Sequence, residues 1–437
     1  MKKFLSALLL LPLCFAAACG EPESSPTQKP QKEETEMLYQ IEDVVKEDLI
    51  WDTKSIFATT PAIKSATTPS NVDPSDNIEL FKFSSAPYAD KDTTWVLAAI
   101  GVPQTEMPKD GYPAVVLAHG GGGTVNFDWI KHWTNRGYVA MAYDVFGHEL
   151  DASGNRIDNP ESGPKETGVG SCLDSVDDPT QSWIYHAVYN AMLSNNILRA
   201  RKDVDKNRIV MTGSSWGGHV TCATAGVDKR FAAFAPLNGC GYVYNDTTWL
   251  KDGFKTGASS WSQEEKEAWA ELYDPSSYLP YATKPMLFVS GVDDAWFSAY
   301  NRTQSAALVK GKTFFAQRTK LNHAQWTHAD EIDAFFRHVL YKENSMTLIG
   351  DILLQDGVAT LQYENQLFTK VNFVYTTSTD ADSHQWVWES ETISPVNGEY
   401  SYKIPEGATA YFFETVLSNT FAQSTAITIV DSNAQYQ

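Results

Sequence analysis

The chain has few cysteines, little positive charge and no hydrophobic run long enough to span a membrane. Five of its 437 residues are cysteine, and none stands in the paired C-x-x-C spacing of a structural zinc site, so we expect no metal. Lys and Arg number 34 against 54 Asp and Glu, which leaves a formal net charge of -20. That charge would repel nucleic-acid phosphates and anionic lipid headgroups. We therefore expect no nucleic-acid partner, and a neutral substrate fits the charge better.

The N-terminus has the pattern of an export signal. Met1 is followed by two lysines, an apolar stretch over residues 4–15 and three alanines ahead of Cys19. A basic start, an apolar stretch and small residues at a cleavage site are typical of a signal peptide. The apolar stretch is shorter than the about 20 residues of a membrane-spanning helix. We predict that residues 1–18 are removed on export.

The alanines that precede Cys19 resemble the lipobox of bacterial lipoproteins. This resemblance implies that Cys19 becomes a lipid-modified N-terminus, which would anchor an exported protein to a membrane in the periplasm or at the cell surface. A soluble secretory signal, with Cys19 incidental, is the alternative. Residues 21–36 are only polar residues and proline, so we predict that residues 19–36 form a flexible tether.

Three cysteines remain for the folded part of the chain. They are Cys172, Cys222 and Cys240. An odd number in an exported protein allows at most one internal disulfide and leaves one free thiol. Their spacing does not choose the pair.

The length and the hydrophobic pattern predict two folded units. A chain of 437 residues exceeds what one hydrophobic core usually serves. Residues 78–83 and 94–100 read as a lead-in hairpin. From residue 113 apolar strands alternate with helices, which is typical of an α/β fold with a mostly parallel, doubly wound sheet. We expect these strands at 114–118, 138–143, 209–213, 231–237, 286–290 and 313–317, helices that include 183–193 and 332–340, and inserts at 147–180 and 241–283.

After Tyr341 the helical pattern ends and short alternating segments follow, broken by turn residues. This change predicts a small antiparallel β-sandwich over residues 345–437, behind an α/β domain over residues 37–342. We expect sandwich strands at 359–363, 370–377, 385–388, 399–402 and 410–414.

The stretch GSSWGG, from Gly213 to Gly218, lies between a predicted strand and a predicted helix. G-x-S-x-G in this position is a nucleophile elbow, in which a tight turn holds the serine in a strained conformation and the glycines avoid side-chain clashes. Gly213, Ser215 and Gly217 fill the pattern, so Ser215 is the candidate nucleophile. An ordinary glycine-rich turn is the alternative.

A second glycine-rich loop, HGGGG, begins at His119 directly after a predicted strand. Glycines allow backbone N–H groups to approach a ligand oxygen closely. We predict an oxyanion hole formed by the N–H groups of Gly121 or Gly122 and of Trp216. The loop lacks the lysine and the Ser/Thr of a phosphate-binding P-loop, and His119 itself reads as structural.

A serine nucleophile needs a base, and the base needs a carboxylate; in this fold they follow the serine in the order acid, then histidine. Asp293 and Asp294 come just after a predicted strand, and physical reasoning alone does not separate them. His323 lies in a loop after the next strand, whereas His328 is close to the last helix. The loop position favours His323 as the base.

With these motifs the chain resembles the α/β-hydrolase superfamily, and within it the group of dienelactone hydrolases, prolyl oligopeptidases and acetyl xylan esterases. The resemblance is carried by HGGGG, GSSWGG, SGVDD at 290–294 and LNH at 321–323. In that family the acid maps to Asp294 and the base to His323. The resemblance implies a Ser-His-Asp acyl transfer without a cofactor, on a small-molecule or polysaccharide ester.

The resemblance favours a carbohydrate esterase of the acetyl xylan type. A prolyl oligopeptidase would carry a β-propeller ahead of its hydrolase domain, and residues 37–112 are too few for one. A peptidase or thioesterase of the same fold is the first alternative. The second is a non-catalytic carbohydrate-binding lipoprotein, which would require a broken triad.

Overall fold

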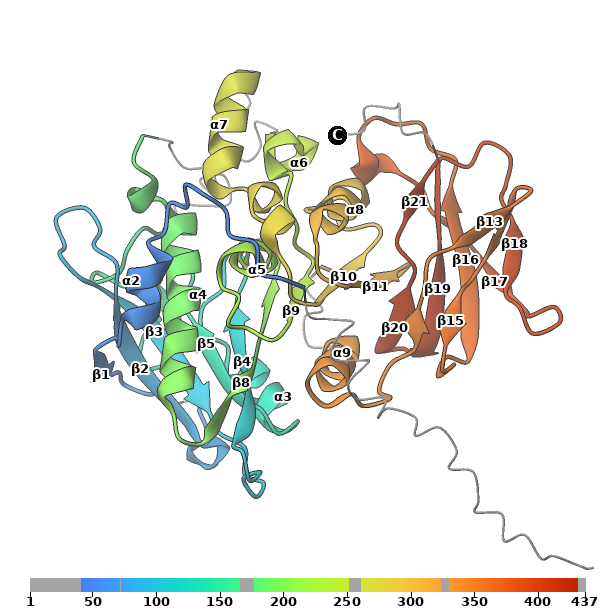
Figure 1. Ribbon diagram of the computed structural model, residues 1–437. Helices are drawn as coiled ribbons and strands as arrows, with labels where there is room; N and C mark the ends of the chain where they lie inside the picture. The colour runs from blue at the N-terminus through green and yellow to red at the C-terminus, as the bar shows by residue number, and fades with distance from the viewer. Residues whose placement is uncertain (1–40, 71, 166–176, 251–260, 324–329, 431–437) are drawn as a thin grey trace, which may run out of the picture. The chain divides into compact units, whose positions relative to one another are not determined.

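The computed structural model describes residues 41–70, 72–165, 177–250, 261–323 and 330–430. Within these ranges, fourteen strands join in one sheet (Figure 1). Thirteen of them are, in spatial order, β1 (Ile63–Ser65), β2 (Ile78–Ser85), β3 (Thr94–Gly101), β5 (Val139–Tyr143), β4 (Tyr112–Ala118), β8 (Val204–Ser214), β9 (Phe234–Leu237), β10 (Met286–Gly291), β11 (Thr313–Arg318), β20 (Phe421–Ser424), β19 (Ala410–Ser418), β16 (Lys370–Thr376) and β17 (Glu389–Ile393). The other, β21 (Thr428–Ile429), pairs with β19.

The centre of the sheet is parallel, as the sequence predicts. From β5 through β4, β8, β9 and β10 to β11, each neighbouring pair is parallel. The lead-in strands β2 and β3 form the predicted antiparallel hairpin, in which Ile78 pairs with Gly101. Parallel strands bring their carboxyl ends to one edge of the sheet, where the loops that carry functional side chains gather.

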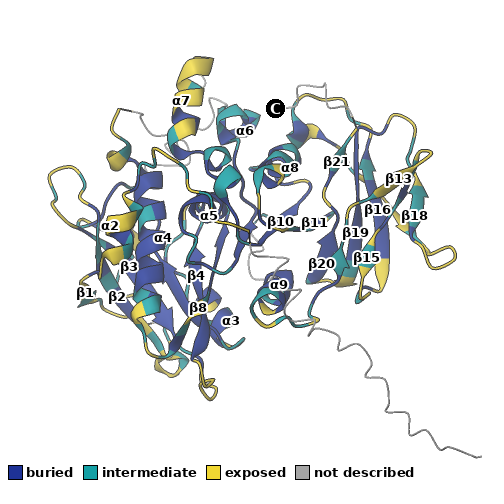
Figure 2. Cartoon of the chain, viewed as in Figure 1, coloured by how far each residue is buried: buried dark blue, intermediate teal, exposed yellow. Residues whose placement is uncertain are grey.

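Helices cover both faces of the parallel strands (Figures 1 and 2). The alternation of side chains along β4 serves two separate cores: Val116 packs in one and Val115 in the other. The Val116 side holds α2 (Thr53–Ala58), α4 (Trp183–Ala200) and α5 (Trp216–Val227), and the Val115 side holds α3 (Phe127–Thr134) and α9 (Asp330–Tyr341). The fold class is therefore the doubly wound α/β class that the sequence indicates.

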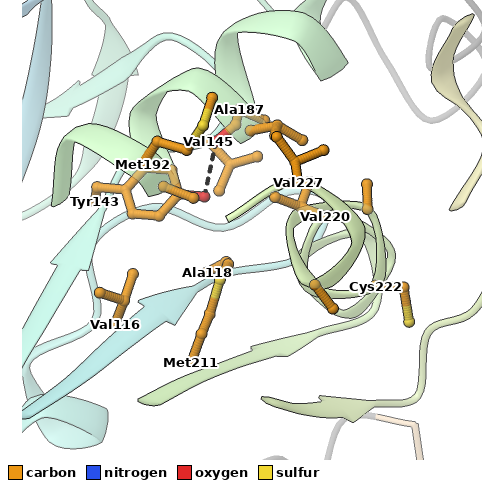
Figure 3. Close-up of a cluster of buried hydrophobic side chains, with 14 of the residues drawn as sticks. Val116, Ala118, Tyr143, Val145, Ala187, Met192, Met211, Val220, Cys222 and Val227 are labelled. Atoms are coloured by element: carbon orange, nitrogen blue, oxygen red, sulfur yellow. Dashed lines mark hydrogen bonds between the residues drawn. The ribbon is translucent and has the colours of Figure 1, made fainter. Parts of the chain in front are cut away.

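The core beneath α4 and α5 fixes these helices to the central strands (Figure 3). Tyr143 of β5 is fully buried and donates a hydrogen bond from its hydroxyl to the Ala187 carbonyl of α4, at 3.0 Å. Val220 of α5 packs in the same cluster as Met211 of β8. A buried tyrosine needs a partner for its hydroxyl group, so this bond also fixes how α4 lies on β5.

The inserts add two further helices, α6 (Thr247–Leu250) and α7 (Gln263–Tyr273), and the hairpin β6 (His148–Leu150) with β7 (Arg156–Asp158). Helix α8 (Ala299–Leu308) connects β10 with β11. Helix α7 begins with a complete capping box, because Ser262 accepts from the Glu265 N–H and the Glu265 side chain accepts from the Ser262 N–H. Among the described residues there is no helix with the length and apolarity to cross a bilayer.

The C-terminal region consists of two layers of antiparallel strands. One layer is formed by β16, β17, β19, β20 and β21, and the other includes β13 (Leu353–Gln355), β14 (Val358–Thr360) and β18 (Ser401–Lys403). Phe373 and Tyr411 pack between the two layers with other aromatic side chains. A further short pair is β12 (Leu348–Ile349) with β15 (Tyr363–Glu364).

The C-terminal strands continue the central sheet. Strand β20 pairs antiparallel with β11, with Ser424 opposite Phe315, and the Ser424 hydroxyl accepts from the Gln317 N–H at 3.0 Å. The Arg318 guanidinium donates to the Thr420 carbonyl at 2.6 Å and pairs with Glu331 of α9. The described residues from 41 to 430 thus belong to one compact unit. The division into an α/β domain and a β-sandwich domain stays a prediction.

One predicted strand, residues 385–388, is wrong. Residues 383–385 form a turn of 3-10 helix that Asp382 caps, and the strand begins at Glu389. The side chains still alternate, with Trp386 buried and Val387 exposed. The indole N–H of Trp386 donates to the Asp380 carbonyl at 2.9 Å. The alternation of buried and exposed side chains therefore arises because Trp386 anchors a loop in the core, and not because these residues pair in a β-sheet.

Candidate active site

Ser215 occupies the sharp turn between β8 and α5. Its φ is 57° and its ψ is -122°, a backbone conformation that a residue with a side chain adopts only under strain of about 1–3 kcal/mol. The turn is held because the Ser215 N–H donates to the Leu237 carbonyl at 2.9 Å and the Ser215 carbonyl accepts from the His219 N–H at 3.0 Å. Ser215 is also the residue that precedes the first turn of α5.

The flanking glycines are required by close backbone contacts. A Cβ atom on Gly217 would lie 1.9 Å from the Ala118 carbonyl oxygen of β4, and one on Gly213 would lie 2.2 Å from the Gly217 carbonyl oxygen. No side chain fits at such distances. The G-x-S-x-G spacing therefore lets α5 begin directly against the end of β4, with the serine at the turn.

Three side chains form a continuous hydrogen-bonded chain. His323 Nδ1 lies 2.7 Å from Asp294 Oδ2, and His323 Nε2 lies 3.0 Å from Ser215 Oγ. An ionised carboxylate can only accept, so Nδ1 carries the proton and donates to Asp294. Nε2 is then free to accept the Ser215 hydroxyl proton. This is the geometry of a nucleophile, a base and an orienting acid.

The Asp294 carboxylate is almost completely buried, with 4% of the residue exposed. Its Oδ1 accepts from the backbone N–H groups of Trp296 and Phe297, both at 2.9 Å. Burial acts to raise the pKa of Asp294, but the hydrogen bond and the charge of His323 outweigh it, so the pKa is lowered. Asp294 is therefore held as an anion beside the imidazole.

The sequence leaves two choices open, Asp293 or Asp294 as the acid and His323 or His328 as the base. The structure distinguishes between the two aspartates. Asp293 is exposed, and Asp294 rather than its neighbour points to the imidazole. His328, the alternative to His323, lies outside the described residues.

The HGGGG loop lies against the serine. A Cβ atom on Gly120 would lie 2.7 Å from Ser215 Cβ, so the loop that continues into Gly121 and Gly122 starts within contact of the serine. Trp216 is the first residue of α5, where backbone N–H groups have no partner within the helix and carry partial positive charge. His119 is buried and its Nε2 accepts from the Val145 N–H at 2.8 Å, so it has the structural position that the sequence indicates.

A hollow of about 510 Å³ opens beside His323. It is lined by Trp296 of the acid loop and Lys320 of the base loop. The Phe297 ring lies parallel to the His323 ring, with centroids 6.3 Å apart. Sequence analysis did not single out Trp296 or Phe297, although both follow Asp294 within three positions.

Two polar side chains missed by sequence analysis hold the loops of the acid and the base. Arg302 of α8 is 1% exposed and donates to the Gly291 and Phe297 carbonyls on either side of Asp294, each at 3.0 Å. Asn238 follows β9 and donates from its side chain to the His323 carbonyl at 2.9 Å. Neither residue belongs to a recognisable motif, because each acts through backbone carbonyls that only the fold brings near.

A buried histidine from the C-terminal region also contacts the acid loop. His384 Nδ1 lies 3.1 Å from the Asp294 carbonyl oxygen, and its Nε2 lies 2.8 Å from Asp246 Oδ1. Both partners can only accept, so both contacts are hydrogen bonds only when the imidazole carries two protons. Burial acts to lower the pKa of His384, but the hydrogen bond and charge of Asp246 and the bond to Asp294 outweigh it and raise the pKa.

The aromatic residues of the second insert are mostly core. The Trp216 side chain packs against Trp249 with centroids 4.5 Å apart, and also against Trp183 and Phe297. Trp269 is fully buried. Trp183 and Trp249 therefore pack around the residue that follows the serine, and for Trp249 and Trp269 the expectation of core packing holds.

Among the described residues, the other cysteines and histidines have no part in the hydrogen-bonded chain of Ser215, His323 and Asp294. Cys222 and Cys240 are free and buried, and Cys172 lies outside the described residues. His186, His219 and His338 are buried in or beside helices. Within the described ranges no three His, Cys, Asp or Glu residues lie together in a way that could hold a metal ion.

Comparisons with known proteins identify the same fold. A family model described as acetyl xylan esterase (AXE1) matches residues 63–242, and one described as the prolyl oligopeptidase family matches residues 186–336. Similar solved structures include an acetyl xylan esterase from Paenibacillus sp. R4, 18% identical, covering 71% of this chain and 100% of its own, with a TM-score of 0.55. Acetyl xylan esterase 1 from Thermoanaerobacterium sp. JW/SL YS485 is 14% identical to this chain. The match covers 72% of this chain and 99% of that esterase, with a TM-score of 0.51.

A search of curated proteins finds no significant match. The two family models together span residues 63–336, from β1 into α9. The chain has the α/β-hydrolase fold, as the sequence resemblance implies.

The close contact of Gly217 predicts a large loss of stability in Gly217→Ala. The new methyl group would overlap the Ala118 carbonyl oxygen, so we expect the free energy of unfolding to fall by about 3 kcal/mol or more. Gly357→Ala is the matched control, because Gly357 has a φ of +74° but open space around it, and it should cost only about 1 kcal/mol. Urea denaturation of both variants measures the difference, and equal losses would contradict the steric argument.

The raised pKa of His384 predicts that the free energy of unfolding depends on pH. Because its folded pKa is raised, its contribution is complete below the unfolded pKa of about 6.5 and is lost as the pH rises through the folded pKa. His384→Gln should therefore lose most stability below about pH 6.5 and less above it. His338→Gln is the control with the opposite sign, since burial lowers the pKa of His338. Urea unfolding between about pH 5 and about pH 9 tests this; parallel curves for the parent and His384→Gln would refute it.

Proposed function

We propose that this α/β-hydrolase-fold protein is a serine esterase that removes acyl groups, above all acetyl groups, from a carbohydrate. One observation carries the proposal: Ser215, His323 and Asp294 form a hydrogen-bonded chain at 3.0 Å and 2.7 Å. Contacts in this order transfer a proton from the serine to an oriented imidazole, which is the requirement for acyl transfer.

In the first step Ser215 Oγ attacks the ester carbonyl carbon. His323 Nε2 takes the hydroxyl proton as the new C–O bond forms, and Asp294 stabilises the resulting imidazolium without taking the proton. The imidazolium then gives its proton to the alcohol oxygen as the ester C–O bond breaks. The alcohol leaves, and the acyl group stays on Ser215.

In the second step water attacks the acyl-serine. His323 takes a proton from the water, and returns it to Ser215 Oγ when the acid departs. The lowered pKa of Asp294 supports this step as well, because an anionic carboxylate at Nδ1 favours the positive charge that appears on the ring in each half of the reaction.

The backbone N–H groups of Gly121, Gly122 and Trp216 are our candidates for the oxyanion hole. The proposal is supported by contact of the HGGGG loop with Ser215 and by the start of α5 at Trp216. A helix N-terminus directs N–H groups and partial positive charge toward an anion. Loss of one such donor typically costs about 3 kcal/mol of transition-state stabilisation.

The choice of a carbohydrate ester is supported by the match of residues 63–242 to the acetyl xylan esterase family model. The match to the prolyl oligopeptidase model covers residues 186–336, which carry the serine, acid and base. Esterases and peptidases use these three groups in the same way, so this second match does not favour peptide substrates. The excess of acidic residues also favours a neutral substrate over an anionic one.

We also propose that the protein is exported and anchored through a lipid on Cys19. The proposal is supported by the basic start, the apolar stretch and the alanines before Cys19, followed by the polar stretch up to residue 36. A tether of that composition would allow a membrane-anchored enzyme to reach an extended polymer.

Substitution of the triad residues should abolish turnover while the fold remains. Ser215→Ala should lower kcat for an aryl acetate by at least about 10⁴-fold, and Asp294→Asn by about 10⁴-fold, since the imidazole loses its orienting anion. Asp293→Asn is the matched control at the exposed neighbour and should stay within about twofold of the parent. Release of the chromophore and of acetate from acetylated xylan measures these effects. Equal activity in the Ser215→Ala variant would refute the mechanism.

The anchor is tested separately. Cys19→Ser should move the protein from the membrane fraction to the soluble exported fraction, because the thiol that would carry the lipid is gone. Hydrolysis of the aryl acetate should be unchanged, since Cys19 lies outside the hydrolase region. Ala18→Gly serves as a control that keeps the thiol and a small residue before it. Unchanged partitioning of Cys19→Ser would show that no lipid is attached there.

A further inference from the structure

A second hollow, of about 380 Å³, lies where the end of β11 meets the C-terminal strands. Arg318, Thr319 and Lys320 contribute from the β11 side. Side chains of β16, β17 and β19, together with Trp388 just before β17, contribute from the C-terminal region. None of these residues belongs to the hydrogen-bonded triad.

This C-terminal hollow is next to the hollow at the triad. Lys320 lines both of them, and the chain runs from Lys320 through two residues to His323. A molecule extended beyond the triad along this loop would therefore meet the C-terminal strands.

Trp388 gives the C-terminal hollow an aromatic wall with a fixed orientation. Its ring packs edge-on against Phe412, with centroids 5.7 Å apart, and against Trp386 at 5.9 Å. Its indole N–H has no hydrogen-bond partner among the described residues. That N–H is itself buried, so the ring, and not the N–H, is what a ligand in the hollow would contact.

The polar side chains of the hollow are also held in place. Glu414 is 4% exposed, and its carboxylate accepts from the Thr319 N–H at 3.0 Å and from the Asn372 side chain at 2.7 Å. Asn372 in turn accepts from the Thr392 hydroxyl at 2.9 Å. Ser390, on the same wall, is exposed. Side chains fixed in this way present acceptors and donors without a further loss of entropy on binding.

We propose that the C-terminal hollow is a subsite for a sugar residue of the polysaccharide chain whose ester reaches Ser215. The inference rests on the proposed esterase function. A sugar ring has an apolar face of C–H groups that packs on an indole ring, and hydroxyl groups around its edge that bond with fixed polar side chains. An aromatic wall with a few placed polar groups is the combination that such a ligand requires.

The proposal assigns the C-terminal region a role in substrate choice. Short acetyl esters would occupy only the hollow at the triad and would not reach Trp388. A longer oligosaccharide would fill both hollows, so only a longer substrate would gain binding free energy from the C-terminal hollow. The subsite should therefore lower KM for oligosaccharides while it leaves hydrolysis of small esters unaffected.

Trp388→Ala tests the subsite against two substrates. For acetylated xylan oligosaccharides we expect KM to rise about tenfold with kcat nearly unchanged, because an aromatic contact is lost. For an aryl acetate both constants should stay within about twofold. Val387→Ala, at the exposed neighbour, is the matched control and should leave both substrates unaffected. Trp388→Phe, which keeps an aromatic face of smaller area, should raise KM for the oligosaccharides by less than Trp388→Ala does.

A second variant is needed because Trp388 packs against Trp386 and Phe412, so Trp388→Ala could also disturb the fold. Ser390→Tyr adds bulk at an exposed position of the same hollow and removes no internal contact, so it should also raise KM for the oligosaccharides alone. Unchanged KM for oligosaccharides in both Trp388→Ala and Ser390→Tyr would overturn the subsite. So would an equal loss on both substrates in Ser390→Tyr.

Direct binding separates failure of the subsite from failure of the proposed function. The Ser215→Ala protein should bind unacetylated xylan oligosaccharides in calorimetry, and Trp388→Ala added to it should weaken that binding about tenfold. Binding that does not depend on Trp388 would overturn the subsite even if the parent hydrolyses acetyl esters. Trp388-dependent binding by a protein that hydrolyses no ester would support the subsite and refute the esterase function.

Discussion

The buried negative charge of Asp294 is the constraint on which the arrangement of the site depends. An isolated carboxylate in a protein interior is very unfavourable, so its surroundings must supply hydrogen bonds and opposite charge. Two backbone N–H groups, from Trp296 and Phe297, and the His323 imidazole meet its oxygen atoms. Because the N–H groups belong to the residues that follow Asp294, the loop must turn tightly around its own carboxylate, and that turn brings Phe297 against the imidazole ring.

A loop bent in this way needs support from outside, and the support comes from distant parts of the sequence. Arg302 holds the Gly291 and Phe297 carbonyls from α8, and His384 contacts the Asp294 carbonyl from the C-terminal region. Each bond to a backbone carbonyl fixes where the loop runs without touching the carboxylate itself. The acid is therefore oriented by groups that need not meet a substrate, which leaves the hollow at His323 lined by Trp296 and Lys320.

The sequence predicted those parts of the site whose chemistry imposes a local pattern. Ser215 stands in the G-x-S-x-G spacing because only glycine fits where the Cβ positions of Gly213 and Gly217 meet backbone atoms, and such a steric requirement leaves a readable motif. The parallel strands were predicted equally well, because strands buried on both faces are continuous apolar runs. Asn238, Arg302 and His384 act on backbone carbonyls far away in the chain, and no local pattern marks them. The strand expected at residues 385–388 failed for a related reason: Trp386 is buried by a tertiary contact of a loop, which gives the same alternation as a strand.

The sequence pattern also did not predict that the C-terminal strands continue the central sheet. This continuity places the C-terminal region in contact with the loop of the base. The pattern marks a change from helices to antiparallel strands after Tyr341, which fits a separate appended domain equally well. In the structure β20 pairs with β11, the strand that leads into the loop of His323, and Glu414 of β19 accepts from Thr319 at the start of that loop. The same loop thus carries the base, His323, at one end and contacts the C-terminal strands at its other end, at Thr319. The C-terminal strands therefore help to fix the loop that carries the base, four residues along the chain from His323.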